Sequence, residues 1–284
     1  MTGEAAMVTN PRRCLLFVPG SRAERFDKAL AADADQVCID LEDAVPPAQK
    51  VAAREALLAF LARHVAQRSE LGVRINPVTT EEGEADLNAL AASMQKPAFV
   101  MLAKTESAAD IETAARALGG VPLIALLESP GAIFNARAIA GASGSIQALM
   151  FGGYDYAVAA RVAPRGPGWF WPRSMLAAAA AEAGIGAIDV PSLDINDADA
   201  VHAETDEAIA LGFSARAAIH PNQVAVIQRC YLPDAVDAER SRRIVESAAG
   251  AHGAAFTFEG KMVDRPIELA ARRTVALAAF GIRT

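Results

Sequence analysis

The amino-acid sequence predicts an α/β fold, namely a (β/α)8 TIM barrel followed by a C-terminal extension of helices and a hairpin. Short apolar runs alternate along the chain with longer segments of helical periodicity, which is typical of βα units. Eight such runs fall within about 220 residues, close to the roughly 30 residues per βα unit of a barrel, whereas a doubly wound sheet usually has fewer strands.

The expected strands are apolar and short, and the segments between them are rich in the helix-forming residues Ala, Leu, Glu and Arg. In chain order the strands are Cys14–Val18, Gln36–Asp40, Gly72–Ile75, Ala98–Leu102, Leu123–Leu127, Ala148–Phe151, Ala187–Asp189 and Ala217–Ile219. Clear helical segments are Ala48–His64, Ala108–Leu118 and Asp197–Leu211. After Pro221 we expect a helix, a charged helix over 234–249 and a hairpin-like piece around 256–263. The predicted organisation is a flexible N-terminus (1–12), a catalytic barrel (13–231) and a C-terminal extension (232–284).

Composition and charge exclude several classes of protein. The 284 residues include 27 Lys and Arg against 34 Asp and Glu, a net charge of −7, which argues against a nucleic-acid partner. A hydrophobic fraction of 52% fits a globular chain, and no apolar run reaches the roughly 18 residues that a membrane span needs. Residues 1–10 lack the basic start and apolar stretch of a signal peptide, and the three cysteines have no metal-like spacing. We therefore expect a cytoplasmic protein with buried thiols at Cys14, Cys38 and Cys230.

Polar residues gather where the predicted strands end. Because all strands of a parallel barrel end on one face, these residues are expected to converge on a single mouth. In chain order they are Arg22 with its neighbours, Asp40 to Asp43, Arg74 to Asn76, Lys104, Glu128, Gly152 to Asp155, Asp189 and His220.

Glu128 and Asp155 each follow a very apolar run, where an unpaired carboxylate would be costly. Two carboxylates from adjacent strands, with no Cys or His beside them, form a hard oxygen site that suits Mg²⁺ completed by substrate oxygens and water. Alternatively, each could pair with a local arginine, or Asp155 could cap the following helix.

Arg74 ends a strand, so its guanidinium is expected to face the mouth, where it suits a carboxylate or a developing enolate oxygen. It could instead pair with Asp40, Glu42 or Asp43. The acidic trio is equally open, because Glu42 or Asp43 could cap the helix near Pro47 or hold metal-bound water.

For two other residues at strand ends, Lys104 and His220, the sequence allows two interpretations each. Lys104 could form a Schiff base, as in some barrel aldolases, or serve a solvated structural role, and His220 could be a base or could position its loop. The pair Gly152-Gly153 is weak evidence for a phosphate loop, and no GxGxxG or Walker-type motif occurs. The aromatic segment Trp169–Trp171 is expected to form a lid or an oligomer contact.

Several blocks of sequence, taken together and in this order, resemble the citrate lyase beta subunit-like family, which belongs to the HpcH/HpaI aldolase/citrate lyase superfamily. They are LLFVPGSRAERFDKAL, ADQVCIDLEDAV, VRINP, LLESPGAI, FGGYDYA, GFSARAAIHPNQV and FEGKMVDRP. The resemblance implies a TIM barrel, Mg²⁺-dependent aldol or Claisen-type cleavage of a CoA thioester into an acyl-CoA and a 2-oxo acid, and a homotrimer.

The resemblance also implies roles for individual residues. Glu128 and Asp155 match metal ligands, Arg74 matches the arginine that contacts the substrate oxygens, and Asp264 in MVDRP matches the acid/base aspartate of the C-terminal segment. Further matches are Gly152 and Gly153 at the substrate, Arg22 and Arg25 at the edge that binds CoA, and Asp40, Glu42 and Asp43 around the metal.

The expected activity is therefore that of a carbon–carbon lyase acting on a citryl-, malyl- or citramalyl-CoA-like thioester. Three alternatives remain open at this stage: a metal-dependent pyruvate aldolase without CoA, a malyl-CoA-type thioesterase, and a non-catalytic CoA-binding subunit. The C-terminal extension and the basic first loop argue against the aldolase.

Overall fold

The computed structural model describes residues 12–65, 68–250 and 253–283, and these form two compact units. The first unit runs from Arg12 to Ile227, and the second contains the residues from Gln228 on. The expected flexible N-terminus falls mostly outside the described residues. Its last residue, Arg12, is described and forms two hydrogen bonds to Glu70, of 2.8 and 2.9 Å.

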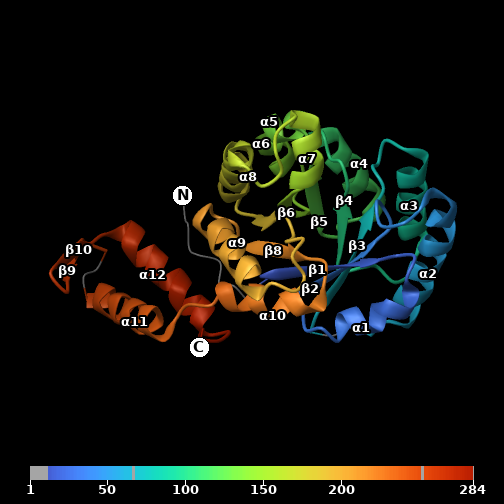
Figure 1. Ribbon diagram of the computed structural model, residues 1–284. Helices are drawn as coiled ribbons and strands as arrows, with labels where there is room; N and C mark the ends of the chain where they lie inside the picture. The colour runs from blue at the N-terminus through green and yellow to red at the C-terminus, as the bar shows by residue number, and fades with distance from the viewer. Residues whose placement is uncertain (1–11, 66–67, 251–252, 284) are drawn as a thin grey trace. The chain divides into compact units, whose positions relative to one another are not determined.

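The first unit is a closed barrel of eight parallel strands paired in chain order, with the last strand returning to the first (Figure 1). The strands are β1 (Cys14–Pro19), β2 (Gln36–Asp40), β3 (Glu70–Ile75), β4 (Phe99–Leu102), β5 (Leu123–Leu127), β6 (Ile146–Phe151), β7 (Gly186–Asp189) and β8 (Ala215–Ala218). The predicted fold class is confirmed, with strand ends that differ by at most two residues from those expected.

Helices lie outside the ring of strands (Figure 1). They are α1 (Phe26–Leu30), α2 (Lys50–Arg63), α3 (Glu81–Ala92), α4 (Ala108–Leu118), α5 (Pro130–Phe134), α6 (Ala136–Ala140), α7 (Gly153–Ala160), α8 (Phe170–Ala183), α9 (Ala198–Ala210) and α10 (Pro221–Cys230), with short 3-10 turns at 23–25, 47–49 and 167–169. Local sequence sets several of their ends, since Ser107 and Asp110 form a capping box at the start of α4 and Gly119, with φ +60°, ends it.

Side chains of alternate residues on each strand fill the barrel, because successive strand residues point to opposite faces. The inward set is apolar: Leu15, Cys38, Phe99, Met101, Ile124, Leu126, Ala148, Met150, Ile188, Ala215 and Ala217. At Gly72 a Cβ atom would lie only 2.3 Å from the Phe99 ring, so glycine there leaves room for the aromatic side chain. All three cysteines are buried, as expected.

The second unit contains the helices α11 (Ala235–Gly250) and α12 (Arg265–Ala278) and the hairpin of β9 (Phe256–Phe258) and β10 (Lys261–Val263). A small core of Ile244, Phe258, Val263 and Ala271 holds these elements together. No helix in the described part of the chain combines the length and the apolar character that crossing a bilayer requires.

Candidate active site at the barrel mouth

A cavity of about 270 Å³ opens at the carboxyl ends of the strands. Several residues of its lining lie two positions beyond an inward-facing core residue on the same strand, so they face the barrel axis as well. Asp40 lies two residues beyond Cys38, Glu128 two beyond Leu126, and Val190 two beyond Ile188. The same spacing places Gly152 and Ile219 in the lining. The alternation that buries the core therefore also selects which strand-end residues reach the cavity.

Glu128 lies at the base of this cavity and is only 5% exposed. One carboxylate oxygen accepts a hydrogen bond of 2.8 Å from the backbone N–H of Lys104. Within the described residues, no side-chain nitrogen of Lys, Arg or His lies within 4 Å of the Glu128 carboxylate. Burial raises the pKa of this carboxyl to about 8, although the charge of Arg74 opposes the rise. Glu128 is thus a buried carboxylate that needs a cation.

Asp155 lies beside it in the first turn of α7, and its charge contributes to the raised pKa of Glu128. The helix begins at Gly152 without any side-chain cap, so the alternative of Asp155 as a cap is wrong. Gly152 also permits close packing, because a Cβ at that position would lie 2.3 Å from Cγ of Glu128. Two adjacent carboxylates on a rigid strand end and helix start fit a hard divalent cation such as Mg²⁺, with room for further oxygen ligands from the cavity.

Arg74, near the end of β3, also lines the cavity and is held by Asp40 through two hydrogen bonds of 2.7 and 2.6 Å. Its guanidinium carbon lies 5.0 Å from the centre of the Phe17 ring. Burial acts to lower the pKa of Arg74, but the hydrogen bonds and charge of Asp40 outweigh it, so the arginine stays protonated. The pairing of Arg74 with Asp40, which the sequence left open, is therefore confirmed. It uses Nε and Nη2 of Arg74, so other N–H groups of the guanidinium remain for a ligand.

Lys104 has a left-handed backbone, with φ +48°, which aims its N–H at Glu128. Its ammonium group contacts the carboxylate of Glu42 and lies 3.3 Å from Asp43. Burial acts to lower the pKa of Lys104, but hydrogen bonding and charge from Glu42 outweigh it and the pKa is raised. Because a Schiff-base lysine must lose its proton to attack, this environment favours the structural alternative.

Some expected residues do not line the cavity. Arg22 forms an ion pair of 2.6 Å with Glu24 on the exposed first loop, and neighbouring Arg25 ends a 3-10 turn. Nδ1 of His220 accepts a hydrogen bond from the backbone N–H of Asn222, which supports a role in the loop.

The expectation that Asp189 lies at the mouth is wrong. It lies next to inward-facing Ile188, so it points to the opposite face of β7, where it pairs with Arg173 at 2.9 Å and Arg216 at 3.4 Å.

The aromatic segment also differs from expectation. Trp169 is 3% exposed and packs edge-on against Phe151 and Tyr154, whereas Phe170 and Trp171 are exposed. A Cβ at Gly153 would lie 2.7 Å from the Trp169 ring, so that glycine makes room for the indole. Tyr154, which lies directly before Asp155, also lines the cavity, as expected for the segment Gly152 to Asp155.

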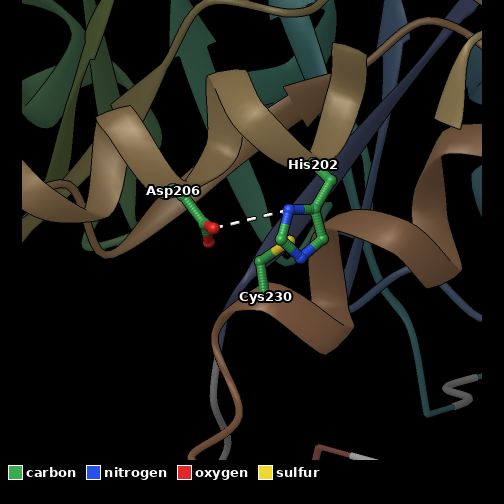
Figure 2. Close-up of side chains that lie close together, drawn as sticks. All are labelled: His202, Asp206 and Cys230. Atoms are coloured by element: carbon green, nitrogen blue, oxygen red, sulfur yellow. Dashed lines mark ion pairs between the residues drawn. The ribbon is translucent and has the colours of Figure 1, made fainter. Parts of the chain in front are cut away.

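A pair of an imidazole and a carboxylate, His202 and Asp206, lies on α9, away from the mouth. Figure 2 shows His202 and Asp206 one turn apart on α9, with 3.4 Å between Nδ1 and the nearer carboxylate oxygen. Cys230, also drawn there, belongs to the end of α10. An exposed pair of this spacing is a common helix-surface interaction.

Asp264 belongs to the second unit and caps the N-terminus of α12. Its side chain accepts a hydrogen bond of 3.4 Å from the backbone N–H of Ile267. Asparagine caps helices as well as aspartate does, so this position allows a substitution that removes the acid and keeps the cap.

The fold and the mouth together define a (β/α)8 barrel protein with two neighbouring carboxylates at its mouth that fit a hard cation. The chain belongs to the HpcH/HpaI aldolase/citrate lyase family, whose model matches residues 13–221. It is 38% identical to a citrate lyase subunit beta-like protein of Mycobacterium tuberculosis, over 89% of this chain and 90% of that one. It is 31% identical to citrate lyase subunit beta of Haemophilus influenzae, over 96% and 98%.

A crystal structure of the protein CitE from Mycobacterium tuberculosis, in complex with magnesium, acetoacetate and coenzyme A, has a similar fold. It superposes with a TM-score of 0.80 at 36% identity and covers 94% of this chain and 98% of that one.

Proposed function

We propose that the protein is a Mg²⁺-dependent carbon–carbon lyase that cleaves a 3-hydroxy-acyl-CoA to an acyl-CoA and a 2-oxo acid, or joins them in reverse. The observation that carries the proposal is Glu128, a buried carboxylate without an ion-pair partner among the described residues, in one cavity with Asp155 and Arg74. Family membership supports it, as do relatives of the chain described as citrate lyase subunit beta and as mitochondrial citramalyl-CoA lyase of Homo sapiens.

Glu128 and Asp155 would hold the metal. When bound, Mg²⁺ supplies Lewis-acid polarisation of the carbonyl of the 2-oxo acid. Related structures of Mycobacterium tuberculosis CitE are described with magnesium and pyruvate and with magnesium and oxaloacetate, which supports this assignment. The backbone N–H of Lys104 fixes the Glu128 carboxylate, and Asp40 fixes the plane of the Arg74 guanidinium.

The remaining residues would stabilise charge and move a proton. Cleavage breaks the bond between the α- and β-carbons of the acyl group, turns the hydroxyl into a carbonyl as the hydroxyl proton passes to solvent water, and leaves negative charge on the thioester enolate. Free N–H groups of Arg74 would donate to the oxygen that carries this charge, an effect worth about 3–4 kcal/mol in comparable sites. Asp264 would then deliver a proton to the α-carbon, and in condensation it would remove that proton.

The test is Asp264→Asn, assayed with citramalyl-, malyl- and citryl-CoA. Because asparagine keeps the cap of α12, the melting temperature should stay within about 2 °C, while kcat should fall at least about 10³-fold. Binding of Mg²⁺ and of a 2-oxo acid, measured by calorimetry, should be unchanged. Turnover at the wild-type rate, or loss of metal binding, would remove Asp264 from the mechanism.

The products distinguish the alternatives. Release of free CoA without acyl-CoA would indicate a thioesterase, cleavage of free hydroxy-keto acids would indicate an aldolase without CoA, and no turnover would indicate a non-catalytic subunit.

We also propose that the protein acts in the cytoplasm as a homotrimer, on the basis of the family resemblance and the free, buried thiols of Cys14 and Cys38. Sedimentation equilibrium measures the oligomeric state directly, and a monomer would contradict it.

A further inference from the structure

The cavity at the barrel mouth has two chemically different walls. One carries the charged groups Asp40, Arg74, Glu128 and Asp155. The other is built from the apolar side chains of Phe17, Val190, Pro191 and Ile219. A ligand held by the first wall would therefore point the rest of its structure toward hydrocarbon.

Cationic charge in this cavity is scarce. Among the described residues that line it, Arg74 is the one cationic side chain, against three carboxylates. Its charge is already balanced by Asp40, which accepts two hydrogen bonds from it, and Glu42 lies 3.5 Å from Nη1. The lining has a net charge of −2, from one arginine and three carboxylates, and a divalent cation brings it to zero. A 2-oxo acid with one carboxylate uses the charge of the metal, and a second carboxylate would find no unbalanced cation among the described residues that line the cavity.

Arg165 does not line the cavity, but it contacts Tyr154, which does. The Tyr154 hydroxyl accepts hydrogen bonds from Arg165 of 3.0 and 2.8 Å, and its ring packs edge-on against Trp169 at 5.4 Å. Tyr154 lines the cavity and Arg165 does not. The guanidinium is also compensated on its far side, where it contacts Glu204 and lies 3.8 Å from Asp194.

We propose that this cavity selects a 2-oxo acid with a short uncharged tail over a 2-oxo dicarboxylate, and that Tyr154 determines this specificity by screening Arg165 from the ligand. The inference rests on the proposed function for the orientation of the ligand, with its 2-oxo carboxylate end on the metal wall. It goes further by naming the class of oxo acid. The physical reason is that a second carboxylate placed against Val190 and Ile219 would lose its hydration without gaining a charge partner.

The experiment is calorimetric titration of the full-length protein, loaded with Mg²⁺, with three ligands. These are pyruvate, freshly dissolved oxaloacetate, and 4-methyl-2-oxopentanoate, which matches the shape of oxaloacetate without its second charge. A blank titration corrects for oxaloacetate decarboxylation. We expect oxaloacetate to bind at least about tenfold more weakly than pyruvate, and more weakly than its neutral match.

Two variant pairs locate the cause. Ile219 is 42% exposed and lines the cavity, so Ile219→Lys can add a cation there without disturbing the core, with Ile219→Gln as the matched uncharged control. Tyr154→Ser opens the cavity to Arg165, and the double variant Tyr154→Ser/Arg165→Gln removes that cation again. Ile219→Lys and Tyr154→Ser should each improve binding of oxaloacetate relative to pyruvate by about five- to tenfold, and both controls should return the ratio to that of the wild type.

The outcomes separate this inference from the proposed function. Binding of oxaloacetate as tight as that of pyruvate in the wild type would overturn the inference, as would a ratio that neither Ile219→Lys nor Tyr154→Ser changes. Either result would leave a Mg²⁺-dependent oxo-acid site in place. If no 2-oxo acid binds in the presence of Mg²⁺, the proposed function fails and the inference fails with it.

Discussion

Two clusters of charged side chains lie on the barrel, and they differ in how the charges are paired. Outside the strands, Asp189 contacts both Arg173 and Arg216, while Glu207 and Glu204 of α9 complete the pairing at 2.5 and 2.6 Å. At the mouth, Glu128 and Asp155 have no ion-pair partner among the described residues.

The difference indicates that the buried charges have different roles in the two clusters. A network in which each carboxylate meets a guanidinium links β7 and β8 to α8 and α9, and it needs nothing further. A buried carboxylate without a partner costs stability unless a ligand supplies the missing charge. The comparison therefore separates a structural cluster from a functional one by the balance of charge, since both contain the same kinds of residue.

The largest effect should follow from removing the unpaired charge. Glu128→Gln keeps the shape of the side chain and abolishes its charge, so the 2-oxo acid should no longer bind in a Mg²⁺-dependent way and turnover should fall by at least about 10³-fold. The melting temperature without metal should not decrease, because the carboxylate is unpaired in the native state. Calorimetry and thermal denaturation check the two halves. A large fall in stability would place Glu128 among the structural charges.

Removing the paired charge should produce the opposite pattern. Asp189→Ala leaves Arg173 and Arg216 buried without their shared partner, which should cost about 3–5 kcal/mol of unfolding free energy in urea. The affinity of the folded protein for Mg²⁺ and pyruvate should stay within about twofold, because Asp189 points away from the cavity. Asp189→Asn, which retains hydrogen-bonding capacity, should cost less. Loss of ligand binding in a folded Asp189 variant would join the two clusters into one site.

These two clusters also show where sequence reasoning succeeds and where it ends. The apolar runs predict the eight strands because their periodicity is local, and Glu128 and Asp155 stand out because each follows such a run. The face on which Asp189 lies depends on a register of single residues, and a shift by one residue moves a side chain to the other side of a strand. The strand was expected to end at Asp189, as it does, but the last residue of a strand can point to either face, so Asp189 was placed at the mouth.

Contacts between residues far apart in the chain could not be predicted from the sequence either. Lys104 meets Glu42 across 62 positions of the chain, and the screening of Arg165 by Tyr154 depends on the path of the loop between α7 and α8. No local pattern encodes which of several arginines a carboxylate will contact. Residue types and strand ends thus predict the chemistry of the mouth, and only the closed barrel shows which charges remain unpaired.

The smallest predicted effect, counted per pH unit, is a dependence of stability on pH that belongs to the unpaired charge alone. The pKa of Glu128 rises from its ordinary 4.5 to about 8 in the folded protein, chiefly through burial. Between these values the native state holds a proton that the unfolded chain has lost, so unfolding free energy falls as pH rises through this window, by at most about 1.4 kcal/mol per pH unit. Burial also raises the pKa of Asp189, so the quantity to measure is the difference between the wild type and Glu128→Gln.

Urea denaturation from about pH 5 to 8 without metal should show a steeper decline of unfolding free energy in the wild type than in Glu128→Gln. Saturating Mg²⁺ should reverse this decline at the alkaline end, because the metal binds the deprotonated carboxylate. Parallel pH profiles for the two proteins would mean that Glu128 is already ionised in the native state and that a cation of the chain itself balances it.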